Sequence, residues 1–355
     1  MAFCGVGRST SGALLLGSLL IAFAVQADES RIRNRTISYV MTDLFWSVYQ
    51  TEDAQNECPR GFNDGPREQF EKLFPDYDSL SIEKTQLAQE IQTWHPNTEP
   101  DDFEFFEVEG ELSWGLNLDG QVSANDFTHP DGTLGIDNEV YRAVGCIIGF
   151  RGPDGVEHIF QNKAILDEVF NRMMIELTEV DSLKNDESVV ITMYRGKDRL
   201  LTDATGQKVM AGGTQRVDYR WGESLIRRFT GQIVDGVLFT EPIAEMVMPW
   251  QNLSVPSVHV FKDARFQLNL SSEGASGVLA GYADVDTWYY QLIRNDSTHH
   301  LSNGQISAIS LYKALRRLAD SHPDPETGNN TAISTALDVR MAQVYIVHPD
   351  IKAAE

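Results

Sequence analysis

Residues 228–240 have the sequence RFTGQIVDGVLFT, in which Asp235-Gly236 separates two short runs of apolar and β-prone residues. An Asp-Gly pair between such runs is typical of two antiparallel strands joined by a two-residue turn, because glycine tolerates the backbone angles that this turn needs. It is the clearest hairpin signal in the chain. It therefore predicts antiparallel β-structure in this part of the protein.

The sequence on both sides of this hairpin has the same pattern of short β-prone runs and turns. Between residues 187 and about 290, short β-prone runs recur at hairpin spacing, and turn sequences at 203–206, 212–213 and 273–274 separate them. We expect these runs to form an antiparallel β-sandwich.

The flanking regions predict helices. The apolar positions of residues 37–50 suit a first helix, further helical stretches lie around 67–74 and 82–94, and residues 306–319 have apolar positions at core spacing. Apolar and acidic residues alternate in 101–118, which predicts a short hairpin. The predicted fold is therefore α+β, with a helical N-terminal region and a short hairpin, then the antiparallel β-sandwich and a C-terminal helix.

The N-terminus predicts export. Arg8 precedes an apolar run over 13–25, and the acidic Asp28-Glu29 follows Ala27. The run is shorter than the roughly 20 residues that span a bilayer, so residues 1–27 are interpreted as a cleaved signal peptide and not as a membrane anchor. We expect a periplasmic or secreted protein with no membrane insertion after signal cleavage.

The remaining chain is predicted to have two parts. Residues 28–185 are expected to form an N-terminal α/β region, and residues 186–355 the β-sandwich with its C-terminal helical segment.

The charge balance limits the partners. The chain has 52 acidic and 29 basic residues, and cleavage after Ala27 removes Arg8 as the only charged residue, so the net charge of −23 becomes −24. This surplus argues against nucleic acid and against anionic membranes as partners, since both attract clustered Lys and Arg. Two explanations for the acidic residues stay open: solubility, and binding of a divalent cation.

Two cysteines, Cys58 and Cys146, remain after cleavage. An even pair in an oxidising compartment predicts one disulfide. The alternative is two buried thiols that act as small apolar residues.

Residues 115–127 have the sequence GLNLDGQVSANDF, which resembles the calcium loop of EF-hand and dockerin modules. In such loops, oxygen ligands recur at every second residue around a glycine. The resemblance implies a structural Ca²⁺ with ligands from residues at the matching positions: Asn117, Asp119, Gln121 through its carbonyl, Ser123 and Asp126.

One departure from this pattern is Gly115, which stands where the first carboxylate of the loop is usual. Asp131 and Asp137 lie nearby and are the candidates for the missing ligand. The alternative is that the acidic residues form hairpin turns, in which their side chains accept hydrogen bonds from backbone amides.

Several blocks, at 57–63, 115–120, 130–138 and 233–238, look like an uncharacterised family of exported bacterial proteins with a dockerin-like or EF-hand-like calcium loop. This resemblance implies export and the loop. No function is known for the family, so the resemblance implies no activity.

One aromatic group is a candidate binding site. Trp288 and Tyr289 lie beside Asp284 and Asp286, and flat aromatic faces next to carboxylates suit a carbohydrate. The alternative is that the aromatic residues are buried anchors of the fold.

The motifs of common enzymes are missing. The mature chain has no G-x-S-x-G, P-loop or dinucleotide-binding sequence. The first hypothesis is an exported soluble binding or scaffold protein, stabilised by calcium, whose partner is a glycan, a small molecule or an envelope protein. The alternative is a periplasmic hydrolase or lyase that acts on a carbohydrate or another acidic substrate through Asp or Glu residues.

Overall fold

The structure is a computed structural model, and it describes residues 35–63, 105–167, 170–206, 208–222, 225–252, 255–293 and 308–348. The expected signal peptide, residues 1–27, and the helices expected around 67–74 and 82–94 lie outside these ranges.

Strands make up most of the regular structure. They are β1 (Arg35–Trp46), β2 (Phe127–Thr128), β3 (Leu134–Ile136), β4 (Arg172–Val180), β5 (Asp186–Gly196), β6 (Gly213–Arg216), β7 (Arg227–Val234), β8 (Val237–Thr240), β9 (Ile243–Asn252), β10 (Val255–Leu270), β11 (Gly274–Asp284), β12 (Ser321–Pro323) and β13 (Asn330–Val347). The helices are α3 (Glu139–Val144), α4 (Val156–Leu166), α5 (Val285–Ile293) and α6 (Ala308–Leu318), with short 3₁₀ turns η2 (Ile148–Phe150) and η3 (Tyr219–Trp221).

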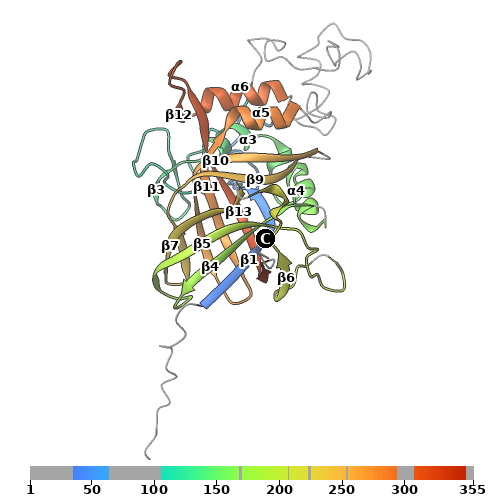
Figure 1. Cartoon of the computed structure of the whole chain (residues 1–355). Helices are drawn as coiled ribbons and strands as arrows, with labels where there is room; N and C mark the ends of the chain where they lie inside the picture. Colours follow the sequence, from blue (N-terminus) through green and yellow to red (C-terminus); the bar gives the residue numbers. More distant parts are fainter. Residues whose placement is uncertain are drawn as a thin grey trace, which may run out of the picture. The chain divides into compact units, whose positions relative to one another are not determined.

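Eight of these strands form a closed antiparallel barrel (Figure 1). The strand order is β1-β4-β5-β7-β8-β10-β11-β13, and β13 pairs back with β1. In this closing pair, Met41 lies opposite Met341 and Trp46 opposite Leu337. Strand β9 pairs with β10, β12 pairs antiparallel with β13, and β6 pairs parallel with the end of β13.

The predicted fold class is therefore wrong in two respects. Residues 37–50 were expected to be helical, but most of them belong to strand β1. A register shift between Met41 and Asp43 explains the error, because it breaks the alternation of the strand and returns Leu44 and Trp46 to the face of Tyr39 and Met41. The resulting spacing imitates a helix. The second error is the sandwich, because the sheet closes on itself.

The Asp235-Gly236 hairpin is confirmed as the turn between β7 and β8, and both residues have positive φ values, 49° and 86°. The sequence division near residue 186 falls between β4 and β5, which pair as neighbours in the barrel. The described residues all belong to one compact unit.

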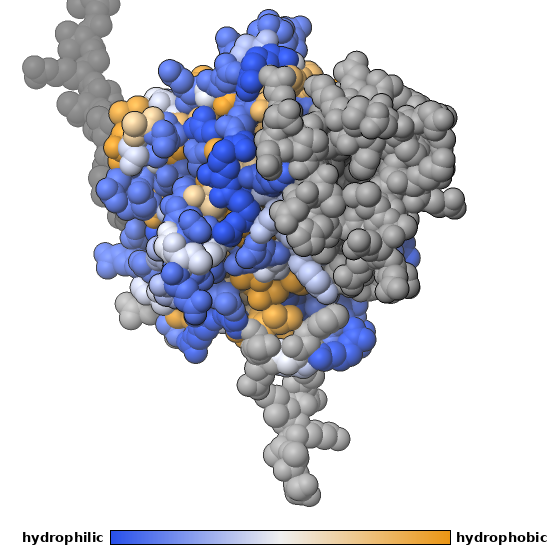
Figure 2. All heavy atoms as spheres, turned by 90° about the horizontal axis from the view of Figure 1, so that it is seen from above, coloured by the Kyte–Doolittle hydropathy of each residue, from blue (hydrophilic) through white to orange (hydrophobic). Residues whose placement is uncertain are grey.

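Apolar side chains fill the barrel. Alternate residues of each strand point inward, and the largest of them are completely or almost completely buried, among them Tyr39, Ile175, Ile191, Phe266 and Leu337. The interior is therefore packed and mostly hydrophobic, and Arg195 of β5 also faces inward. Outside, the face shown in Figure 2 is mostly hydrophilic, with small separate apolar areas, as the acidic composition leads us to expect.

The segment before α3 packs on the outer wall of the barrel. Leu116 and Leu118 of this segment contact Ala280 of β11 and Ala336 of β13, which form a second, smaller apolar cluster. At one end of the barrel, α5 and α6 lie side by side (Figure 1). The outer wall thus serves as a rigid base for the irregular segments.

Gly277→Ala tests the close approach of β10 and β11. A Cβ atom on Gly277 would lie 2.0 Å from the carbonyl oxygen of Gln267 and 3.0 Å from the Cα atom of Leu268. We expect the substitution to lower the free energy of unfolding by about 1–3 kcal/mol, as overpacking does in other cores. Thermal melts measure this, with the exposed neighbour Ser276→Ala as the control. Equal melting temperatures for the two variants would contradict this packing.

Candidate functional site

A buried asparagine holds the segment of residues 111–138 on the barrel. The Asn138 Nδ2 group donates hydrogen bonds to the carbonyl oxygens of Ser47 and Trp114, at 3.1 and 3.0 Å. Its Oδ1 atom accepts from the backbone of Tyr141 and caps α3. One side chain therefore fixes where the segment leaves the barrel wall and where α3 begins.

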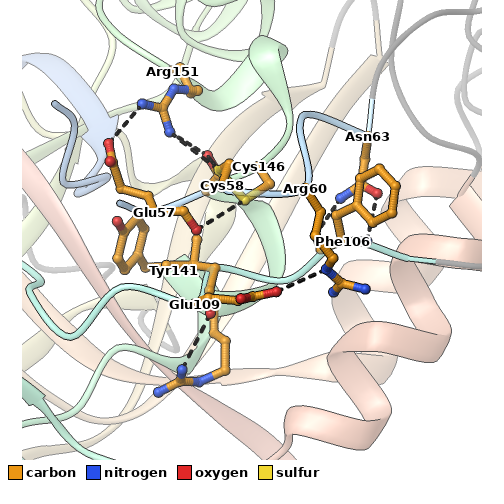
Figure 3. Close-up of a disulfide and its surroundings, with 12 residues drawn as sticks. Glu57, Cys58, Arg60, Asn63, Phe106, Glu109, Tyr141, Cys146 and Arg151 are labelled. Atoms are coloured by element: carbon orange, nitrogen blue, oxygen red, sulfur yellow. Dashed lines mark hydrogen bonds and ion pairs between the residues drawn. A yellow bond between two sulfur atoms is a disulfide. The ribbon is translucent and has the colours of Figure 1, made fainter. Parts of the chain in front are cut away.

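A disulfide ties the other end of α3 to the residues after β1 (Figure 3). Cys58 and Cys146 form this bond, with their Cα atoms 5.7 Å apart, and the predicted pairing is confirmed. The sulfur atoms are buried beside an ion pair between Glu57 and Arg151, whose Nη2 and Oε1 atoms lie 3.1 Å apart.

The buried Glu57 carboxylate accepts several hydrogen bonds. It accepts from the backbone and hydroxyl groups of Thr51, at 2.6 and 2.5 Å, and from Arg151. Burial alone raises the pKa of Glu57, but these hydrogen bonds outweigh burial, and the net pKa is below the ordinary value. Arg151 also donates to the carbonyl of Gly145, at 2.6 Å. The ion pair between Glu57 and Arg151 therefore helps to fix the backbone around the disulfide and the end of α3.

The side chains of the predicted calcium loop form hydrogen bonds with the backbone of the same loop and so stabilise its turns. Asn117 Oδ1 accepts from Gly120 N at 2.6 Å, and Asn117 Nδ2 donates to the carbonyl of Gln121 at 2.6 Å. Asp119 Oδ1 accepts from Gln121 N at 2.8 Å. Asp126 Oδ2 accepts from Ser123 N at 2.5 Å. This is the turn geometry of the alternative interpretation.

Asp131 and Asp137 also accept backbone hydrogen bonds, Asp131 from Thr133 at 2.9 Å and Asp137 from Leu118 at 2.6 Å. In the part of the chain that the structure describes, no three His, Cys, Asp or Glu side chains form a group that could hold a metal ion. Calcium binding by this loop stays a prediction.

Asp137 is the one buried carboxyl of this set. Burial raises its pKa to about 6, and the charges of Asp119 and Asp126 act in the same direction, against the hydrogen bond from Leu118. Asp137 therefore joins two parts of the segment, and it does so at the cost of burying a charge at neutral pH.

A pocket of about 330 Å³ lies between this segment and the outer wall of β8 and β10. We call it the loop pocket. Its polar and aromatic lining consists of Asn117, His129, Asp131 and Thr133 from the segment, and of Phe239, Thr240, Arg265, Phe266 and Gln267 from the barrel.

Arg265 supplies the positive charge of the loop pocket. Its Nη2 group donates to the carbonyl oxygen of Leu118 at 2.7 Å, and its Nη1 group lies 3.4 Å from that of Asn117. Among the described residues, no carboxylate forms an ion pair with it. Arg265 thus anchors the segment and keeps its charge unneutralised beside the pocket.

The opposite wall carries a negative charge. His129 Nδ1 and Asp131 Oδ1 lie 2.8 Å apart. Hydrogen bonds from Thr133 and the contact with His129 lower the pKa of Asp131 to about 2, so this carboxylate is ionised at neutral pH. Phe239 is 36% exposed and adds an aromatic surface. The loop pocket therefore offers a cation, an anion, amide and hydroxyl groups, and a ring.

The predicted aromatic site lies elsewhere, on α5. Trp288 is buried and stacks in parallel on Trp46, with the ring centroids 4.6 Å apart. Tyr289 stacks on Tyr312 of α6 at 4.2 Å. These rings pack α5 against the barrel and α6, as the alternative interpretation describes.

The two aspartates at the start of α5 have structural partners. Asp284 accepts from the backbone of Thr287 at 2.8 Å and lies 3.5 Å from Lys262. Asp286 accepts from the hydroxyl of Tyr312 at 3.0 Å.

The comparisons with known proteins give no relative. No family model matches the sequence, and neither a curated protein nor a solved structure matches the chain. None of the helices in the described ranges is long and apolar enough to span a membrane.

Asp137→Asn tests the buried carboxyl. The pKa of Asp137 is about 6 in the folded protein and 3.8 as the ordinary value, so the folded state binds the extra proton between these pH values. The stability that this proton provides is lost as the pH rises from about 4 to about 6. We expect the free energy of unfolding of Asp137→Asn to rise relative to that of the wild type across this window, by up to about 3 kcal/mol. Denaturant unfolding at several pH values measures this difference.

Asp131→Asn is the matched control, because the low pKa of Asp131 places its titration below this window. A constant difference between Asp137→Asn and the wild type from pH 4 to 7 would contradict the raised pKa. Addition of Ca²⁺ at pH 7 extends the test. If Asp137 completes a calcium site, Ca²⁺ raises the melting temperature of the wild type and not that of Asp137→Asn.

Proposed function

We propose that the protein is an exported binding protein that holds a small polar ligand in the loop pocket. The observation that carries this proposal is the convergence of Arg265, Gln267, Asp131 and the Phe239 ring on one space of about 330 Å³. This volume is at the lower end of the range for ligand sites, and a few directed polar groups with an apolar wall are typical of them.

The lining favours one sugar unit as the ligand. A sugar hydroxyl both donates and accepts hydrogen bonds, so it needs acceptors such as the Asp131 carboxylate and donors such as the Arg265 guanidinium. The Gln267 amide supplies both. The flat Phe239 ring suits the apolar face of a sugar. A free sugar or the exposed end of a glycan therefore matches the site.

The filled interior of the barrel supports this position for the ligand. Because apolar side chains occupy the inside, the ligand contacts the outer wall, where the segment of residues 111–138 supplies the other half of the pocket. The disulfide, Asn138 and Arg265 hold that segment in place. The proposal of export rests on the sequence of residues 1–27 and agrees with a disulfide, which persists in oxidising compartments.

Binding is favoured over hydrolysis at this pocket. Glycoside hydrolysis normally uses two facing carboxyl groups, one of them protonated. Of the described residues, Asp131 is the one acid that lines the loop pocket, and its pKa of about 2 prevents it from acting as a general acid near neutral pH.

A hydrolytic arrangement elsewhere is weaker. Ser321 Oγ lies 3.0 Å from His322 Nδ1, and His322 Nε2 lies 3.2 Å from Asp263. These residues line neither the loop pocket nor another pocket, near Phe45 and Asp338, and the ion pair between His322 and Asp263 is partly exposed. The hydrolase alternative therefore stays secondary.

Calorimetric titration with a panel of monosaccharides and short oligosaccharides tests the proposed ligand. We expect at least one of them to bind, and Phe239→Ala and Gln267→Leu to weaken its binding by about tenfold each, since each removes one contact. Tyr345→Ala is the control, because Tyr345 is exposed on β13 and does not line the pocket. If no sugar binds, or if the control weakens binding equally, the assignment of the loop pocket is wrong.

A further inference from the structure

Among the described residues, two arginines are buried, and their charged groups have very different partners. Arg172, with none of its surface exposed, donates to the carbonyl oxygens of Ile165, Asp167 and Asp198. The first two of these carbonyls lie at the C-terminal end of α4, where the helix dipole favours a cation. The charge of Arg172 is therefore matched by its surroundings.

Arg195 has no such match. Only 3% of its surface is exposed. It lies on the inward face of β5, in alternation with Met193 and Ile191, and opposite Met173 of β4. Its Nη2 group donates to the carbonyl oxygen of Val247 in β9, whereas its Nε and Nη1 atoms have no hydrogen-bond partner. No carboxylate among the described residues pairs with it.

A second arginine adds to the positive charge. Arg227, the first residue of β7, repels Arg195, and burial together with this repulsion lowers the pKa of Arg195 to about 9. Arg195 thus keeps its charge at neutral pH. Arg227 donates from Nε to the carbonyl of Glu245 in β9 at 3.0 Å, and its Nη2 atom lies 3.6 Å from the exposed Glu245 carboxylate. Both arginines therefore contact the same strand, β9.

A buried ionised group is stable only when something balances its charge. The chain has 52 acidic residues, yet none of the described ones is placed on Arg195. Water could accept from Nε or Nη1, but it brings no charge. An oxyanion brings the charge, and it has enough acceptor atoms for both free donors.

We propose that Arg195 binds the oxyanion group of a small ligand, a carboxylate or a phosphate, between the ends of β5 and β7 and strand β9. This site shares no residue with the loop pocket, so it is independent of the proposed sugar site.

Thermal melts at constant ionic strength test the site, with phosphate or acetate replacing chloride. We expect one or both anions to raise the melting temperature of the wild type to a plateau and to leave Arg195→Met unchanged. A shift with phosphate alone assigns the site to a phosphate group, and a shift with acetate alone to a carboxylate. No shift in the wild type, or equal shifts in both proteins, would overturn the proposal.

Two further variants separate anion binding at Arg195 from the loss of any buried arginine and from surface salt effects. In chloride, Arg195→Met is expected to melt at or above the wild type, because it removes an unbalanced charge, whereas Arg172→Met is expected to melt lower. Arg216→Gln, an exposed arginine paired with Asp198, is expected to keep the full response to the anion. Loss of the response in Arg216→Gln would identify a surface salt effect and contradict the site.

Arg195→Lys covers the case in which Arg195→Met does not fold. It keeps the charge and loses the geometry of the guanidinium, so the Kd of the stabilising anion, from calorimetric titration, is expected to rise by about tenfold. An unchanged Kd for Arg195→Lys would show that Arg195 does not hold the anion.

Discussion

The pairing of β1 with β13 is the constraint on which the other features depend. These strands come from opposite ends of the described chain, and their hydrogen bonds close the sheet into a barrel. Closure removes the free edges of the sheet and encloses the inward side chains in one core. It also fixes the outer wall. Without a rigid wall at β8, β10, β11 and β13, the segment of residues 111–138 has nothing to pack on, and the loop pocket has only one side.

The buried charged groups around this core have three kinds of surroundings. Glu57 and Arg151 form a buried pair beside the disulfide, with further hydrogen bonds from Thr51. Arg172 is matched by backbone carbonyls. Arg195 has one backbone carbonyl as its hydrogen-bond partner and, among the described residues, no carboxylate that balances its charge, and the proposed oxyanion site rests on this difference. A strongly acidic protein can therefore still hold local positive sites where its buried arginines lack carboxylates.

The sequence predicted local features better than the way in which they assemble. Asp235-Gly236 specifies its turn through glycine's backbone freedom, so the β7–β8 hairpin was correctly predicted. The pairing of Cys58 with Cys146 was predicted from their even number together with the expected oxidising compartment, and it is confirmed. In residues 37–50, the register shift between Met41 and Asp43 gives the apolar residues of a strand a spacing that is typical of a helix. Closure could not be predicted either, because the strand pattern does not show whether the first and last strands meet.

The candidate site was predicted only in part, for the same reason. Asn117 and Asp131 were singled out from the sequence and line the loop pocket, but Arg265 and Gln267 come from β10, far along the chain. Only the barrel brings them together. His129, two residues before Asp131, also lines the pocket, although a histidine directly before a proline favours a surface turn.

A cysteine pair across the closing strands tests the barrel most directly. Asp43 of β1 lies opposite Arg340 of β13, and both side chains reach solvent. We expect Asp43→Cys with Arg340→Cys to form a disulfide on mild oxidation, detected by mass spectrometry of the digested protein, while Asp43→Cys with Ser276→Cys, one strand further away, does not. If the Asp43→Cys and Arg340→Cys thiols stay free, the strands do not meet and the closed barrel is wrong.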